Sequence, residues 1–163
     1  MKSKTEKIAL AIAILIIILV IAGIVGLVSL VKRVFHITKE AISVNTFIEV
    51  MEDNDFAVTK VTDKDSINAK DAYIAEKGEY QIEFYTFDDV DDADDFFNIT
   101  RSKFDSDRAN TRIQFHGRNY ESFNIVTGGK YKFVERIDKT VIYVNVDNEY
   151  KKSVNDALEK LGY

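Results

Sequence analysis

The chain has 163 residues, which suits one modest domain together with one additional element. It contains no cysteine, so disulfides, thiolate metal sites and cysteine nucleophiles are excluded. The formal net charge of −5 is unevenly distributed: residues 1–39 carry six Lys/Arg and one Glu, whereas residues 40–163 carry 16 Lys/Arg and 26 Asp/Glu. The acidic part would repel phosphate backbones, so no nucleic-acid partner is expected.

Residues 8–31 form an apolar run of 24 residues without a charged side chain. As a helix with a rise of about 1.5 Å per residue, the run would be about 36 Å long, enough to cross a hydrocarbon core of about 30 Å. A cleaved signal peptide would have an apolar region of about 7–15 residues and then a small-residue cleavage site. The following stretch "SLVKRVF" offers no such site, so the sequence predicts an uncleaved transmembrane helix.

The charges that flank the apolar run bear on its orientation. Three lysines precede it and three basic residues follow it, so the positive-inside rule is nearly balanced. The short lysine-rich head favours an N-inside, single-pass arrangement in the cell membrane with the domain outside the cytoplasm, and a cytoplasmic domain stays as the alternative. The expected parts are a basic head, a transmembrane helix, a juxtamembrane linker or helix and a soluble acidic domain, at residues 1–7, 8–31, 32–42 and 43–163.

Apolar residues recur at steps of three and four over residues 34–51, which predicts a helix. Either one helix continues from the membrane, or the chain breaks within 38–46 and a new helix begins there. Ser43 and Thr46 are good capping residues, which favours the break. Thr46 with Glu49 also matches a capping box, so the new helix is expected to begin at Thr46.

The middle of the chain combines strands with one helix. Alternating apolar residues at 56–63 predict a strand, and residues 72–87 predict a hairpin whose turn lies at Lys77-Gly78. An amphipathic helix is expected at about residues 88–104. Its apolar face would comprise Val90, Ala93, Phe97 and Phe104.

The last third is rich in strands. Turn signals, of which Gly128-Gly129 is typical of a two-residue hairpin, divide it into a meander. A final helix at 148–161 would be capped by Asp147 and ended by Gly162. The strands of the meander are predicted at 111–116, 120–127, 130–136 and 140–146.

These elements predict an α+β domain. Strands joined by short turns form an antiparallel sheet, here of about six to seven strands covered by about three helices, and we expect the helices to cover one face. Tyrosines that point outward on a helix-free face would form a binding surface. The candidates are Tyr80, Tyr85, Tyr120, Tyr131 and Tyr143.

The stretch "TFDDVDDADDFF" at residues 86–97 contains six aspartates. Carboxylates in a first helical turn are stabilised by the helix dipole, and Thr86 or Asp88 could cap the helix. Capping does not account for all six, so the surplus is a candidate docking patch for a basic partner. The patch consists of Asp88, Asp89, Asp91, Asp92, Asp94 and Asp95.

Signatures of metal binding and catalysis are missing from the sequence. Calcium usually takes six to eight oxygens from a folded loop, but the glycine-containing loop pattern is absent from residues 86–100. The two histidines, His36 and His116, stand apart, and neither a G-x-S-x-G nor a nucleotide-binding motif occurs. No metal, cofactor or catalytic residue is therefore predicted.

The sequence favours a non-enzymatic interaction module at the membrane surface, with a protein or an envelope component as its partner. Two alternatives stay open. One is a membrane-tethered hydrolase that uses a pair of carboxylates, and the other is a calcium-responsive domain.

Overall fold

The computed structural model describes residues 38–62, 68–105 and 111–163. These residues form a seven-stranded antiparallel sheet with three α-helices, which confirms the α+β class. The basic head, the predicted transmembrane helix at 8–31 and the first part of the linker lie outside the described residues. Among the residues that are described, no helix is long and apolar enough to cross a membrane.

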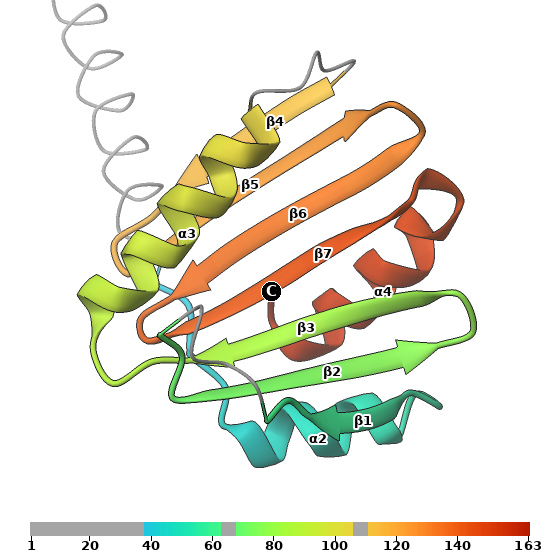
Figure 1. Ribbon diagram of the computed structural model, residues 1–163, viewed down its shortest axis with the longest axis horizontal. Helices are drawn as coiled ribbons and strands as arrows, with labels where there is room; N and C mark the ends of the chain where they lie inside the picture. Colours follow the sequence, from blue (N-terminus) through green and yellow to red (C-terminus); the bar gives the residue numbers. More distant parts are fainter. Residues whose placement is uncertain (1–37, 63–67, 106–110) are drawn as a thin grey trace, which may run out of the picture. The chain divides into compact units, whose positions relative to one another are not determined.

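The sheet is built from two meanders that meet through their last strands. Its order is β1-β2-β3-β7-β6-β5-β4, so β3 pairs with β7 in the centre while β1 and β4 form the two edges (Figure 1). The strands are β1 (Ala57–Lys60), β2 (Asp71–Lys77), β3 (Tyr80–Thr86), β4 (Thr111–His116), β5 (Tyr120–Thr127), β6 (Lys130–Ile137) and β7 (Thr140–Asp147).

Local turn chemistry sets the lengths of these strands. Gly128 and Gly129 have φ values of 53° and 77°, the left-handed pair that a tight hairpin with matching twist requires. The turn between β2 and β3 lies one residue later than predicted, because Lys77 still pairs with Tyr80. The first strand, expected over residues 56–63, is shorter than its alternation indicated.

The helices are α2 (Val44–Glu52), α3 (Val90–Asp105) and α4 (Lys151–Leu161), the last preceded by the short 3₁₀ helix η2 (Asn148–Tyr150). The predicted break before α2 is confirmed, since residues 38–43 are not helical. Ser43 caps this helix instead of Thr46: its Oγ accepts a hydrogen bond from the Thr46 backbone N–H at 3.1 Å.

The end of the domain also differs in one detail from the prediction. Asp147 precedes η2 as predicted, but its side chain makes no capping hydrogen bond. Its carboxylate lies instead 2.9 Å from Nζ of Lys130, its partner on the neighbouring strand β6. The helix ends as expected at Gly162, which has a left-handed φ of 82°.

Helices lie on both faces of the sheet, so the expectation that they cover one face is wrong. Two of them, α2 and α4, pack on one face, and α3 packs on the other (Figure 1). The physical reason is that successive strand residues point to opposite faces, and the inner strands are apolar on both. Thus Phe84 and Ile142 face α2 and α4, whereas Val134 and Val141 face α3.

One part of the α2/α4 face stays uncovered. All six residues of β4 are exposed, and two of them are large apolar residues on the same face. Ile113 is 41% exposed and Phe115 is 58% exposed. The open part of the sheet therefore lies at the β4 edge, beside the region that α4 covers.

Candidate functional site

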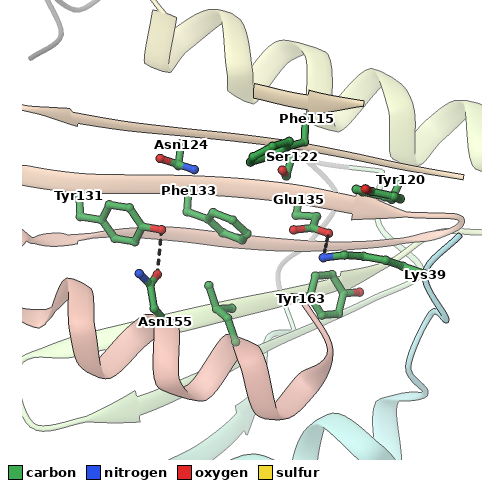
Figure 2. A pocket seen from close by; sticks show the side chains of 11 residues that line it. Lys39, Phe115, Tyr120, Ser122, Asn124, Tyr131, Phe133, Glu135, Asn155 and Tyr163 are labelled. Carbon is green, nitrogen blue, oxygen red and sulfur yellow. Dashed lines mark hydrogen bonds and ion pairs between the residues drawn. The ribbon is translucent and has the colours of Figure 1, made fainter. Parts of the chain in front are cut away.

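A pocket of about 410 Å³ opens on this uncovered part of the sheet (Figure 2). Strands β5 and β6 form its floor, α4 forms one wall and β4 contributes to the opposite wall. We call it the Glu135 pocket. Its lining residues are Lys39, Phe115, Tyr120, Ser122, Asn124, Tyr131, Phe133, Glu135, Asn155, Leu158 and Tyr163.

The pairing register of strands β4, β5 and β6 places the residues that form the floor of the Glu135 pocket side by side. Ser122 lies opposite Glu135 on the neighbouring strand, and Asn124 lies opposite Phe133. On the outer side, Phe115 lies opposite Ser122. Because directly opposed residues of antiparallel strands share a face, this register places polar and aromatic groups in alternate positions on one surface.

A partly buried ion pair lies at one end of the pocket. Glu135 is 2% exposed, and Lys39 Nζ lies 2.5 Å from its Oε1. Burial raises the pKa of the Glu135 carboxyl, and the Lys39 ammonium opposes that rise. The same Nζ lies 5.2 Å from the centre of the Tyr120 ring. The two charges compensate each other, so the side chains that line the pocket carry no net charge.

The backbone of Lys39 is fixed as firmly as its side chain. Its N–H donates to Asn119 Oδ1 at 3.1 Å, and its C=O accepts from Asn119 Nδ2 at 2.9 Å. The Asn119 amide also donates to Asp138 Oδ2 at 2.9 Å, which connects two turns of the sheet. Lys39 had been expected in the linker, and nothing in the local sequence indicated that it completes a pocket.

Two phenols complete the polar lining. Tyr131 donates to Asn155 Oδ1 at 2.9 Å, and burial, with a smaller effect of the Glu135 charge, raises the pKa of Tyr131 to about 12. Tyr163 Oη lies 2.6 Å from Thr140 Oγ1, and burial raises the pKa of Tyr163 as well. Both phenols therefore stay protonated at neutral pH and act as hydrogen-bonding groups.

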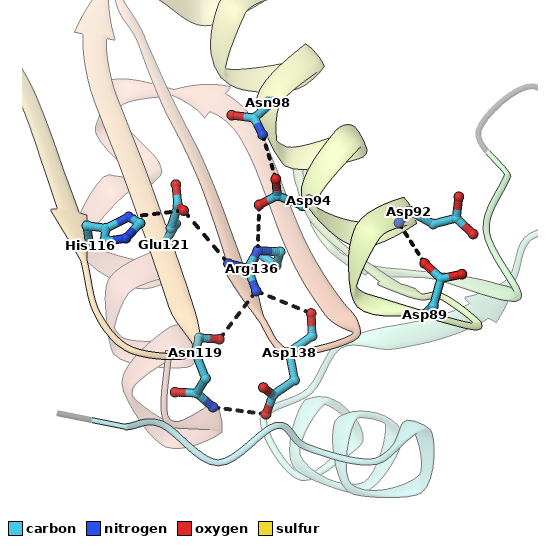
Figure 3. A network of polar contacts seen from close by, with 9 residues as sticks. All are labelled: Asp89, Asp92, Asp94, Asn98, His116, Asn119, Glu121, Arg136 and Asp138. Atoms are coloured by element: carbon cyan, nitrogen blue, oxygen red, sulfur yellow. Dashed lines mark hydrogen bonds and ion pairs between the residues drawn. The ribbon is translucent and has the colours of Figure 1, made fainter. Parts of the chain in front are cut away.

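The opposite face of β6 carries a second polar cluster, centred on Arg136 (Figure 3). This side chain is 9% exposed, and its Nε lies 3.2 Å from Asp94 Oδ1. Its Nη2 lies 3.8 Å from Glu121 Oε1, and the same Glu121 oxygen lies 3.0 Å from His116 Nδ1. Asp94 also accepts a hydrogen bond from Asn98 at 3.0 Å. The cluster joins α3 to β5 and β6, so its visible role is structural.

Comparison with known proteins adds little. No protein-family model matches the chain, and no curated protein matches it. A protein described as a GTP-binding regulator, from Thermotoga maritima, is 19% identical, with 78% of this chain and 93% of that chain covered and a TM-score of 0.48. LppA from Mycobacterium tuberculosis, described as a candidate lipoprotein, is 12% identical, with 63% and 70% covered and a TM-score of 0.27. Neither likeness supports a functional conclusion.

The aspartates of the predicted patch make different local contacts and have different roles. Asp89 caps α3, because its Oδ1 accepts a hydrogen bond from the Asp92 backbone N–H at 2.9 Å. The expectation that Thr86 or Asp88 would cap is wrong, since the helix begins only at Val90.

Other aspartates of the patch contact neighbouring polar residues. Asp88 lies 3.2 Å from Lys70 Nζ, and Asp92 Oδ1 accepts from Asn68 Nδ2 at 2.9 Å. Four of the six carboxylates, counting Asp94, thus have intrachain contacts that include their side chains. The remaining two, Asp91 and Asp95, are exposed. Docking by the whole patch stays a prediction.

The remaining sequence candidates lie in separate places. In the part of the chain that the structure describes, no group of three or more His, Asp or Glu side chains is arranged to hold a metal ion. His36 lies outside the described residues. The five tyrosines do not form one surface, because helices cover both faces. Tyr120 and Tyr131 line the Glu135 pocket, Tyr80 packs on the α2/α4 face, and Tyr85 and Tyr143 pack on the α3 face.

Proposed function

We propose that this chain is a membrane-anchored binding module whose domain holds a neutral sugar unit of an envelope glycan in the Glu135 pocket. The observation that carries the proposal is the compensated Lys39–Glu135 pair in a lining of aromatic rings and amides. A pocket without net charge offers no electrostatic gain to an ionic ligand, whereas its polar groups can still orient a neutral one.

The lining matches the two surfaces of a sugar ring. Phe115 and Tyr120 offer aromatic faces against which the C–H groups of a sugar can pack. Asn124 and Asn155 both donate and accept hydrogen bonds, as sugar hydroxyl and acetamido groups do. The volume of about 410 Å³ lies in the usual range for small-ligand sites, about 300–1,000 Å³.

The predicted arrangement in the membrane supports a ligand of this class. An uncleaved anchor at residues 8–31 with the N-terminus inside would place the domain outside the cytoplasm, where envelope glycans occur. The hydrolase alternative requires two carboxylates at the substrate. Glu135 is the one carboxylate side chain among the lining residues of this pocket, so no observation favours hydrolysis over binding.

Calorimetric titration of the full chain in lipid nanodiscs with the tetramer of N-acetylglucosamine tests the proposal. We expect saturable binding that Tyr120→Ala weakens about tenfold, because a stacked ring is lost. Ile99→Ala is the matched control, since Ile99 is 57% exposed but lies on α3. Absence of binding at millimolar tetramer, or equal affinity of wild type and Tyr120→Ala, would overturn the proposal. Release of shorter sugars would instead favour the hydrolase.

A further inference from the structure

Within the described residues, strand β4 forms an unpaired edge of the sheet. Its sequence, TRIQFH, contains neither the lysine nor the proline that commonly blocks edge strands. All six residues are exposed. One residue of this strand, Phe115, also lines the Glu135 pocket.

The backbone groups that face away from the sheet can be assigned. The Gly117 N–H donates to the Tyr120 C=O at 2.9 Å, which makes these two residues a hydrogen-bonded pair. Hydrogen-bonded and non-hydrogen-bonded pairs alternate along an antiparallel ladder. With the observed register of β4 on β5, the free N–H and C=O groups at the edge belong to Arg112, Gln114 and His116.

We propose that β4 pairs antiparallel with β4 of a second copy of this chain, with the Gln114 residues of the two copies opposite each other. In this register, Ile113 lies opposite the partner's Phe115, and Phe115 lies opposite the partner's Ile113. The two apolar residues that are exposed on the free edge, 41% and 58%, cover one another on one face.

The same register also pairs the free backbone N–H and C=O groups of the two edge strands. Gln114 faces the partner's Gln114, and Arg112 faces the partner's His116, so every outward-facing residue meets an outward-facing residue. Shifting the strands until Ile113 faces the partner's Ile113 would place Phe115 opposite the partner's Thr111 and lose the apolar match. A two-fold axis through Gln114 therefore meets both requirements, as an isologous contact must.

The two polar side chains that this pairing brings together, Arg112 and the partner's His116, each already lie beside a carboxylate. Arg112 Nη2 lies 2.7 Å from Asp105 Oδ1, and His116 Nδ1 lies 3.0 Å from Glu121 Oε1. Both residues therefore keep a carboxylate neighbour of their own chain when they face each other across the pairing. The pairing would also place the partner's Ile113 against Phe115, which lines the Glu135 pocket, so that a second copy extends the wall of the pocket.

One pair of six-residue strands buries less surface than a stable interface of about 1,200–2,000 Å². The dimer is therefore expected to be weak when the chain is dilute. Anchoring of both copies in one membrane would raise their effective concentration and favour the pairing.

Cysteine crosslinking of the full chain in lipid vesicles tests this pairing. The chain has no cysteine, so Gln114→Cys introduces a single thiol. Opposed residues in a hydrogen-bonded pair lie about 5.5 Å apart between their Cα atoms, within the range of about 4.4–6.8 Å that a disulfide accepts. We expect Gln114→Cys to form disulfide-linked dimers under mild oxidation at least tenfold faster than Arg112→Cys and Ile99→Cys.

Two results would overturn the proposal. One is equal crosslinking of Gln114→Cys and Ile99→Cys, which would indicate random collision. The other is faster crosslinking of Ile113→Cys than of Gln114→Cys, which would indicate a different register. A second substitution, Phe115→Lys, is expected to abolish the crosslinking of Gln114→Cys while leaving the circular dichroism spectrum unchanged; retained crosslinking in a folded protein would contradict the apolar match.

Discussion

Lys39 Nζ lies 2.5 Å from Glu135 Oε1, although 96 residues separate them in the sequence. The contact fixes the segment before α2 to strand β6. Burying a carboxylate in an apolar environment is costly unless a partner compensates, and here the ammonium supplies the compensation. The Lys39–Glu135 pair thus has two roles. It balances the charge of the pocket lining, and it attaches the segment before α2 to the sheet.

The pair predicts a pH dependence of stability. Burial raises the pKa of the Glu135 carboxyl above its ordinary value of 4.5, so the folded state binds this proton more tightly than the unfolded state. The protonated carboxyl contributes its full stabilisation at pH values below the pKa that Glu135 has in the unfolded chain. That contribution is lost as the pH rises through the higher pKa of Glu135 in the folded state. Glu135→Gln removes this titration. Urea unfolding from pH 4 to pH 7 should therefore show a larger loss of stability in wild type than in Glu135→Gln; parallel curves would contradict it.

Much of the sheet could be predicted from the sequence because its signals are local. The last four strands lie within one residue of their predicted ends, and the turns that follow β5 and β6 contain residues with left-handed backbone. Gly128 and Gly129 have φ values of 53° and 77°, and Asp138 has a φ of 48°. Turn residues of this kind constrain the chain without help from distant contacts.

The sequence did not predict which face of the sheet each helix covers, nor the presence of the Glu135 pocket. Both depend on contacts between residues that are far apart in the chain. An amphipathic helix indicates which of its faces is apolar, but the choice of sheet face is made by packing. Asp94 was expected to be a surplus surface carboxylate, yet Arg136 reaches it from β6. Lys39 and Tyr163 come from opposite ends of the domain and meet only at the folded sheet.

Arg136→Met should destabilise the fold by about 3 kcal/mol. The substitution removes the guanidinium beside Glu121, whose side chain is 14% exposed, and leaves His116 as the remaining polar contact of that carboxylate. Removing one member of a buried ionic group is costly. Arg112→Met is the matched control, because Arg112 and Asp105 are each 48% exposed and such pairs contribute at most about 1 kcal/mol. Urea unfolding compares the two variants, and equal losses would show that burial of Arg136 has no energetic consequence.

Asp89→Ala should lower the free energy of unfolding by about 1 kcal/mol, because the hydrogen bond to the Asp92 backbone N–H is lost at the start of α3. Asp95→Ala is expected to change it by less than about 0.5 kcal/mol, since this exposed side chain lies beyond the first turn. Thermal unfolding of both variants separates capping from the general charge of the segment. A larger effect of Asp95→Ala would mean that the cluster stabilises the domain in a way that capping does not explain.

Gly117→Ala should disturb the Glu135 pocket, although Gly117 is not itself a lining residue. A Cβ at this position would overlap the ring of Tyr120, and the φ of Gly117 lies outside the left-handed region, so the backbone itself accepts alanine. Overpacking of this kind costs about 1–3 kcal/mol. The cost should fall below about 0.5 kcal/mol in a Tyr120→Ala background, where the ring is absent, and a double-mutant cycle measures this difference. An equal cost in both backgrounds would place the strain in the backbone, whereas the expected coupling would establish that Gly117 is required because the Tyr120 ring occupies the space above it.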